Sequence, residues 1–172
     1  MGNSFVEILA KKKATIAKEW FQLAIQAYAP DTVEFLKNKS DPFANPVGST
    51  TLRGIQGLLD QLIHGMDRDA ITSFLDPIIR IRAIQDFTPS QATGFIVILK
   101  KVLRENFVKE LRDSQIAREF LEFEANIDRL CLMAFDIYMQ CREKIYQISA
   151  NETRNRTFKA FERAGLISEE SG

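Results

Sequence analysis

Apolar residues recur at steps of three and four along most of this chain, the spacing of one face of an α-helix. The first stripe predicts an amphipathic helix over residues 5 to 28, which opens with a capping box of Ser4 and Glu7. A second box, Asp31 with Glu34, predicts a short helix that ends near Lys39. Alternation of the β-strand kind is nearly absent. We therefore expect an all-α protein.

The stretch SDPFANPVGS, residues 40 to 49, interrupts the helical pattern with two prolines and a glycine. This composition predicts a loop, because proline cannot continue a helix and glycine and asparagine favour turns. Phe43 and Val47 lie inside the loop. We expect these two apolar side chains to attach it to the core.

The third stripe, residues 50 to 64, ends at His64 and Gly65, a basic last-turn residue followed by a C-terminal glycine. Gly54 and Gly57 would weaken this helix in isolation. We therefore expect another helix to approach it closely at these two positions.

Two dipeptides that end in proline, Asp76-Pro77 and Thr88-Pro89, then predict the starts of two helices. Asp76 is expected to cap a helix whose first residue is Pro77. Thr88 is expected to cap the next helix, residues 89 to 111, with Gln91 completing a capping box. The first half of this last helix is almost wholly apolar, so it should be the central and most buried one.

The final stripe, residues 114 to 148 with Asp113 or Ser114 as its cap, runs for roughly nine turns, longer than a domain of this size needs. The apolar side of this helix would have too few partners within the chain. Such a surface is most often buried by a second copy of the chain in a two-fold symmetric dimer. We therefore expect a homodimer; the alternative is that the first helix folds over this stripe in a monomer. The residues expected at the dimer interface are Leu130, Ala134, Ile137, Tyr138, Cys141 and Ile145.

Together these elements predict a single all-α bundle of about seven helices with a long C-terminal helix. We assign residues 1 to 148 to the helical domain and residues 149 to 172 to a polar, partly helical extension. The 172 residues are 45 % hydrophobic and 27 % charged, which is ordinary for one soluble globular domain.

Charge and segment lengths exclude several classes of function. The 23 basic and 23 acidic residues give zero formal net charge, which disfavours binding to nucleic acid or to an anionic membrane. The apolar runs are too short to span a bilayer, and the first residues lack the order of a secretory signal. Cys131 and Cys141, ten residues apart in one helix, cannot form a disulfide. We expect a cytoplasmic protein with reduced thiols.

Catalytic motifs are missing from the sequence. It shows no nucleophile and base at a typical spacing, no metal-ligand cluster and no phosphate-binding glycine loop. His64, the single histidine, stands at a helix end, where it is expected to interact with the last carbonyls rather than to bind haem. We therefore expect neither an enzyme nor a bound metal or cofactor.

The strongest candidate for a binding site is IRIRAIQDF, residues 79 to 87, where two arginines interrupt an apolar run. Arg80 and Arg82 lie on different sides of a largely buried helix, so at least one must run along apolar surface. One interpretation is structural: an Arg82–Asp86 ion pair, with Arg80 reaching solvent. The other is an anion or partner site with the free N–H groups of the next helix. The residues of that site would be Arg80, Arg82, Asp86, Thr88, Ser90 and Gln91.

The segments DPFANPVG, residues 41 to 48, and RIRAIQDFTPSQATGFIVIL, residues 80 to 99, together with Trp20, resemble the RsbRD N-terminal domain family. The resemblance covers residues 5 to 149. It implies a non-haem, globin-like sensory domain of the kind that precedes a phosphorylatable STAS domain in RsbT co-antagonist proteins of stress signalling. The chain ends at Gly172 without room for a STAS domain, so the RsbT-sequestering role is not carried over and we expect a stand-alone module without haem.

Three functions are compatible with these observations. The leading one is a sensory or regulatory interaction module that binds a protein partner or a second copy of itself. The second is a small-molecule or anion sensor with a cavity in its helical core, in which Arg82 or Arg80 holds an acidic group. The third is an accessory subunit of a cytoplasmic redox or metabolic complex. Thermal melting against metabolites and anions would separate the first two.

Overall fold

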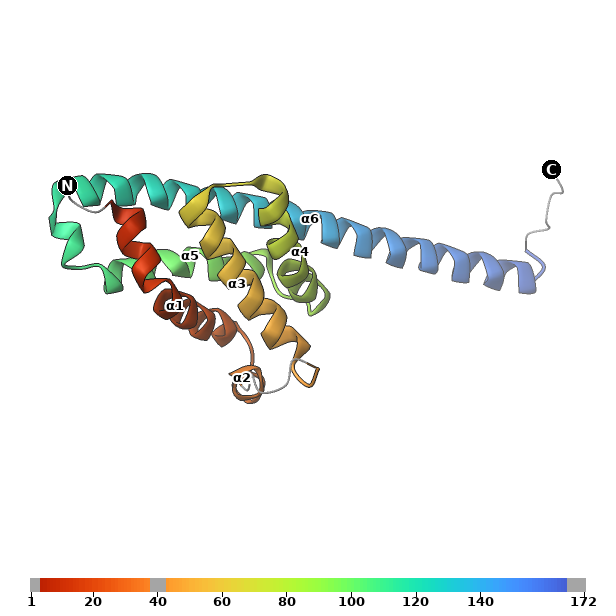
Figure 1. Cartoon of the computed structure of the whole chain (residues 1–172). Helices are drawn as coiled ribbons and strands as arrows, with labels where there is room; N and C mark the ends of the chain where they lie inside the picture. Colours follow the sequence, from red (N-terminus) through yellow and green to blue (C-terminus); the bar gives the residue numbers. More distant parts are fainter. Residues whose placement is uncertain (1–3, 38–42, 167–172) are drawn as a thin grey trace. The chain divides into compact units, whose positions relative to one another are not determined.

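The computed structural model describes residues 4–37 and 43–166 of the chain. Within these ranges every regular element is a helix, as Figure 1 shows. The elements are α1 (Phe5–Ala24), η1 (Ile25–Ala27), α2 (Pro30–Lys37), α3 (Pro46–His64), α4 (Arg68–Ile84), α5 (Pro89–Asn106), η2 (Glu110–Arg112) and α6 (Ser114–Arg163). The all-α class and the long last helix are confirmed. The described residues form six α-helices and two 3-10 helices, and the globin likeness stays a prediction.

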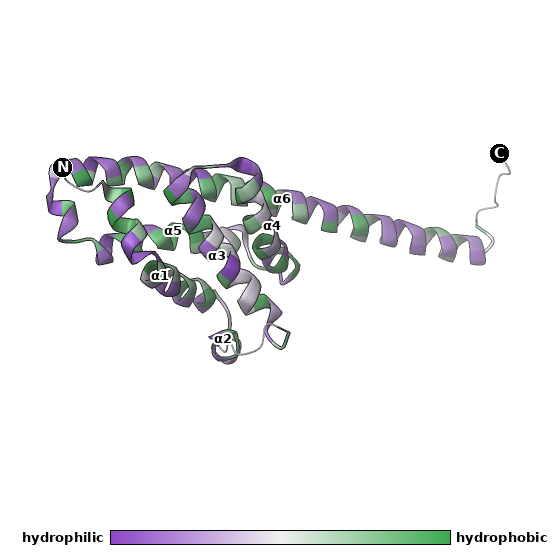
Figure 2. Ribbon diagram, viewed as in Figure 1, coloured by the Kyte–Doolittle hydropathy of each residue, from purple (hydrophilic) through white to green (hydrophobic). Residues whose placement is uncertain are grey.

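The chain divides into two compact units, Met1–Tyr138 and Met139–Gly172, and α6 contributes residues to both. In the second unit the helix is mostly hydrophilic, which Figure 2 shows by its largely purple ribbon, and nearly all of its described side chains are exposed. The first unit holds the other helices and the hydrophobic core. The domain boundary expected at residue 148 stays a prediction.

The first unit is built around α1, which lies against α3 and α5, while α3 lies against α4. A Cβ added at Gly54 would lie 2.6 Å from Cδ1 of Ile78 and 3.0 Å from the carbonyl oxygen of Phe74. A Cβ added at Gly57 would lie 2.5 Å from the ring of Phe74. The two glycines of α3 therefore permit a close approach to α4, as the sequence predicted.

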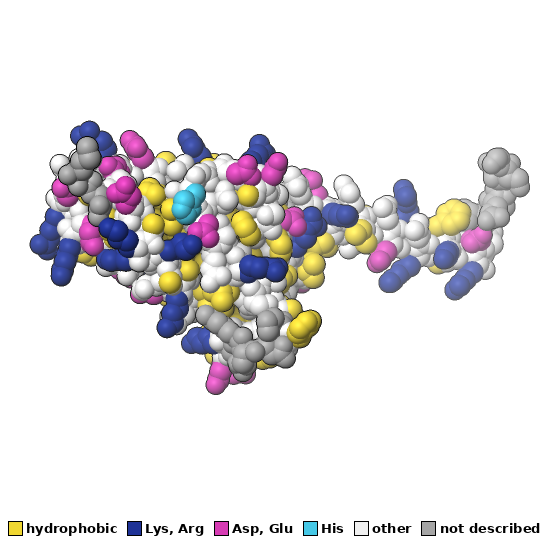
Figure 3. All heavy atoms as spheres, viewed as in Figure 1, with side chains coloured by type: hydrophobic (Ala, Val, Ile, Leu, Met, Phe, Trp, Pro, Cys, Tyr) yellow, Lys and Arg dark blue, Asp and Glu magenta, His cyan; other side chains and the backbone are white. Residues whose placement is uncertain are grey.

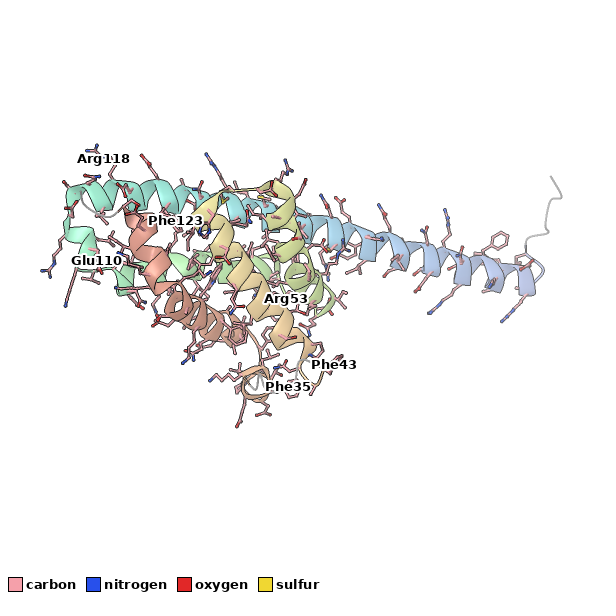
Figure 4. The ribbon with its side chains drawn as sticks, in the orientation of Figure 1. Phe35, Phe43, Arg53, Glu110, Arg118 and Phe123 are labelled. Carbon is pink, nitrogen blue, oxygen red and sulfur yellow. The ribbon has the colours of Figure 1, made fainter. Side chains whose placement is uncertain are left out.

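Within the first unit, aromatic and ionic contacts hold the beginning of α6 against α1 and α5. The ring of Phe5 on α1 meets Phe120 and Phe123 edge to face, with centroids 5.1 and 5.2 Å apart. Figure 4 labels Phe123 on α6 beside α1. The guanidinium of Arg104 on α5 donates two hydrogen bonds of 2.9 Å to the carboxylate of Glu124, which is nearly buried. Both contacts bring sequence-distant residues together and fix which side of α6 faces inward.

Local sequence signals place most helix starts correctly. Ser4 and Glu7 form the expected capping box of α1, and Thr88 and Gln91 form that of α5. The carboxylate of Asp113 accepts hydrogen bonds from the backbone N–H groups of residues 115 and 116, so Asp113 is the cap of α6. Each of these caps acts over three residues or fewer, which is why the sequence suffices.

The predicted helix break at Asp76 and Pro77 is wrong. Pro77 lies inside α4, whose N-cap is Asp67. A proline in this position removes one backbone hydrogen bond, but the apolar residues on both sides of it, including Leu75 and Ile78, are buried. Packing of this face against α3 therefore keeps the helix continuous where local preference would end it.

The predicted loop of residues 40–49 is helical from Pro46 onward. Asn45 caps α3 by accepting from the N–H of Gly48 over 2.9 Å, and its side-chain amide donates to the carbonyl oxygen of Leu36 over 3.1 Å. Phe43, labelled in Figure 4, is 96 % exposed, so it does not attach this segment to the core. Buried Asn45 does so instead.

The short helix α2 begins at Pro30, one residue before the predicted cap Asp31, which lies in its first turn. Its expected end near Lys39 falls outside the described residues.

Candidate functional site

The side chain of Arg82 is the centre of the candidate site. It extends from the last turn of α4, is 0 % exposed and is among the largest fully buried side chains of the first unit. Its Nη2 donates to the carbonyl oxygen of Ala24 over 3.0 Å, and its Nη1 to that of Gln91 over 3.1 Å and that of Ala92 over 3.4 Å. Arg82 thus joins the end of α1 to the start of α5.

Three aromatic rings surround the guanidinium of Arg82. Its carbon lies 4.7 Å from the centroid of Phe95, 5.5 Å from that of Phe87 and 5.6 Å from that of Tyr28. Burial lowers the pKa of Arg82, an effect that the nearby phenol of Tyr28 partly opposes. Burial likewise raises the pKa of Tyr28. The environment of Arg82 is therefore apolar and low in dielectric.

The Arg82–Asp86 ion pair expected from the sequence does not form. Backbone carbonyls, Tyr28 and aromatic faces surround Arg82, and its Nε is a buried nitrogen without a hydrogen-bond partner. Asp86 instead follows the end of α4 with a φ of 58°, in the left-handed region, which turns the chain toward α5.

The other candidates of the arginine stretch have local roles. Arg80 is largely exposed and pairs with Asp76 one turn earlier, with 2.6 Å between Nε and the carboxylate oxygen. The hydroxyl of Thr88 accepts from the N–H of Gln91 in the capping box. Most N–H groups at the start of α5 are thereby satisfied within the helix, so this helix start is not an anion site by itself.

A cavity of about 410 Å³ lies beside Arg82, between the end of α1, η1 and α5. Of the six predicted site residues, Arg82, Ser90 and Gln91 line it, whereas Arg80, Asp86 and Thr88 do not. Half-buried Leu23 and Ile98 supply apolar walls. The cavity is open to solvent and within the size range of small-molecule sites.

Sequence reasoning missed several residues of this cavity, including Leu23, Gly94, Phe95 and Lys101. Gly94 was the one available signal, because it stands alone in an otherwise apolar helix where glycine lowers stability. The other residues are typical of an amphipathic helix. Their assembly around Arg82 depends on how α1 and α5 lie together.

The part of the predicted dimer interface that belongs to the first unit, Leu130 to Tyr138, faces the interior of that unit. Leu130, Ala134, Ile137, Tyr138 and Cys141 are buried, and Ile145 is half-buried. The hydroxyl of Tyr138 donates to the carbonyl oxygen of Phe87. The expectation that this stripe lacks partners within the chain is therefore wrong for its buried members, although the dimer itself stays a prediction.

The opposite side of α6 in the first unit is exposed and partly apolar. Leu132 is 67 % exposed and Phe135 44 % exposed. Leu132 lines a cavity of about 400 Å³, together with Ile71 of α4 and Met133. The charged side chains Arg129 and Asp136 border the same face. A protein contact of α6 would use this side.

Other candidate chemistry is sparse in the described part of the chain. His64 is exposed, visible in cyan in Figure 3, and its Nδ1 lies 3.1 Å from the carbonyl oxygen of Asp60, one turn earlier. No cluster of three or more histidine, cysteine or acidic side chains could hold a metal ion among the described residues. Basic and acidic groups are interspersed on the face of the first unit in Figure 3.

Within residues 4–37 and 43–166, no helix is long and apolar enough to cross a membrane. Burial of the Cys131 thiol raises its pKa, which disfavours the reactive thiolate. We assign a function to two surfaces of the described residues, the Arg82 cavity and the outer side of α6.

A protein-family model described as the RsbT co-antagonist protein rsbRD N-terminal domain matches residues 14–153. The matched range includes Trp20 and residues 80–99, on which the resemblance in the sequence rested. A comparison with curated proteins found no match, and neither did a comparison with solved structures.

Proposed function

Since the chain belongs to the RsbRD N-terminal domain family, we propose that it is a non-enzymatic sensory or regulatory module of bacterial stress signalling. The observation that carries the proposal is the family match over residues 14–153. The proposal includes a cytoplasmic location and action through protein contact rather than through a chemical reaction. A module of this kind needs a surface for its partner and, if it senses, a site for its signal.

The outer side of α6 is the surface that suits protein contact. Leu132 and Phe135 are exposed apolar side chains on one helical face, and such side chains are typical anchors of an interface. The cavity of about 400 Å³ that Leu132 lines could receive a side chain of the partner.

We take the partner on this surface to be a second copy of the chain. Arg129 and Asp136 are exposed, carry opposite charges and stand seven residues apart on either side of Leu132. In two antiparallel copies of α6 around a two-fold axis near Leu132, Arg129 of one copy would face Asp136 of the other. A two-fold interface requires a patch that is complementary to itself in this way.

Photo-crosslinking in the source cells tests the proposal. A benzophenone amino acid is placed at Leu132 and, in a second variant, at Phe135, and cells are irradiated before and after heat or salt stress. We expect an adduct of two chains whose yield changes with stress, because a regulatory module must alter its contacts when the signal arrives.

Val108 is the matched control, because it is an apolar side chain of similar exposure, 55 %, outside α6. The same adduct at Val108 would mean that the contact is not specific. A yield that stress leaves unchanged would contradict a regulatory role, and an adduct with another protein would replace the second copy as the occupant of this surface.

A further inference from the structure

The cavity beside Arg82 has the charge, the shape and the free space of a ligand site. We propose that it binds a small organic anion with an apolar body, the chemistry of a short-chain or aromatic carboxylate. This ligand would supply the signal of the proposed regulatory function, but its binding can be measured on the purified chain without that function.

The charge of Arg82 is the first reason. Its guanidinium is completely buried, and three backbone carbonyl oxygens accept its hydrogen bonds, with no carboxylate among its contacts with the described residues. Its Nε has no hydrogen-bond partner. A buried cation without a counter-charge is unfavourable, and its field acts strongly through surroundings of low dielectric. An anion above Arg82 would provide the missing counter-charge.

The second charged residue that lines the cavity is also positive. Lys101 lines the cavity, and none of the lining residues is acidic. Its ammonium lies 3.8 Å from Glu105, and both side chains are about two-thirds exposed, so this pair can open at little cost. The cavity therefore favours a negative ligand.

The walls explain why the ligand should be partly apolar. Leu23 and Ile98 face the cavity with hydrocarbon side chains, and Phe95 adds an aromatic ring. Polar groups occur at Ser90 and Gln26, where they could orient an anionic head. A few polar groups on an apolar wall of this size are typical of sites for small organic molecules rather than for inorganic ions.

Gly94 is the second, independent observation. It lines the cavity in the interior of α5, where glycine is less favourable than alanine. A Cβ added at Gly94 would meet no atom within 4 Å, so packing within the described chain does not require glycine there. The missing side chain keeps the cavity open, and a ligand would use that space.

Calorimetric titration of the purified full chain tests the proposal, with hexanoate and benzoate as probes and hexanamide and benzamide as their neutral counterparts. We expect at least one carboxylate to bind about tenfold or more tightly than its amide, the ratio that corresponds to one hydrogen bond to a charged group. Gly94→Leu should abolish this binding by filling the cavity, while Gly94→Ala should largely keep it. Lys101→Gln should weaken it several-fold.

Gly94→Leu is preferred to a change of Arg82, because Arg82 joins two helices and its loss could unfold the chain. Absence of carboxylate binding at millimolar concentration, equal affinity for the acid and its amide, or unchanged binding by folded Gly94→Leu would each overturn the proposal. A chain that binds carboxylates but shows no stress-dependent crosslink would keep this site and reject the proposed regulatory function.

Discussion

The indole N–H of Trp20 donates to the carbonyl oxygen of Phe95 over 2.6 Å, and the two rings are stacked with their centroids 6.3 Å apart. Trp20 belongs to α1 and Phe95 to α5, the helices on either side of the Arg82 cavity. Because the Phe95 ring also lies 4.7 Å from the guanidinium of Arg82, Trp20 positions the aromatic surface on which the buried charge rests. This contact links the packing of the core to the candidate site.

Trp20→Phe is expected to lower the free energy of unfolding by about 1–3 kcal/mol, since it removes a buried hydrogen bond and leaves a small void. Urea unfolding followed by circular dichroism measures the change. Phe35→Leu, at an exposed aromatic position of α2, is the control and should shift the free energy by less than about 0.5 kcal/mol. Equal stability of the two variants would contradict the role given to Trp20.

Two glycine substitutions are expected to have opposite effects. Gly54→Ala should destabilise the chain by about 1–3 kcal/mol, because the new Cβ would meet the backbone carbonyl of Phe74 at 3.0 Å. Gly94→Ala should stabilise it by about 0.5–1 kcal/mol, because alanine is the better helix former and the space there is open. Thermal melting of both variants and of the parent protein shows whether each substitution raises or lowers the melting temperature. A stabilising Gly54→Ala would mean that α3 and α4 are not in close contact.

The ion pair between Lys12 and Glu110 should make the stability of the fold depend on pH in the acidic range. A hydrogen bond from its own backbone, and then one from Lys12, lower the pKa of Glu110 below its usual 4.5. Because the folded-state pKa is the lower one, the stabilisation is fully present above pH 4.5 and is lost as the pH falls through the lowered value. Glu110→Gln should therefore lower the free energy of unfolding by about 0.2–1 kcal/mol at neutral pH and leave it unchanged in strong acid.

Melting temperatures of parent and Glu110→Gln, measured from neutral to strongly acidic pH, give this difference directly. Glu105→Gln is the control, because its carboxylate is mostly exposed and lies 3.8 Å from Lys101. A difference for Glu110→Gln that stays constant down to strong acid would show that its charge is not the cause.

Substitutions on the two sides of α6 should separate assembly from folding. Leu132→Asp, on the exposed side, is expected to convert a dimer to a single chain of 19.6 kDa while leaving the melting temperature of the monomer nearly unchanged. Ile137→Asp, on the buried side, is expected to lower the melting temperature strongly because it buries an unpaired charge. Sedimentation at micromolar concentration with parallel melting distinguishes them. A parent that sediments as one chain at this concentration would end the dimer proposal.

The candidate site was only partly predictable. Arg82 attracted attention because an arginine in an apolar stripe must be buried or run along apolar surface, and it is buried. Its partners could not be predicted, because Ala24 is 58 residues away in sequence and the carbonyl groups of Gln91 and Ala92 carry no side-chain signal. The sequence favoured Asp86 because a helical pattern predicts contacts only between residues three or four apart in the same helix, and Asp86 is four residues after Arg82.

What the sequence alone determined are features that depend on a few consecutive residues: the helical periodicity, the capping boxes of Ser4 and Thr88, and the family resemblance that the match over residues 14–153 confirmed. Tertiary packing decided the rest. It kept α4 continuous through Pro77, turned the stripe of Ile137 inward and placed the charge of Arg82 beside an open cavity. The physical reason is that a periodic pattern of apolar residues shows which face of a helix is apolar but not which residues pack against that face. These residues depend on how the other helices are arranged in space.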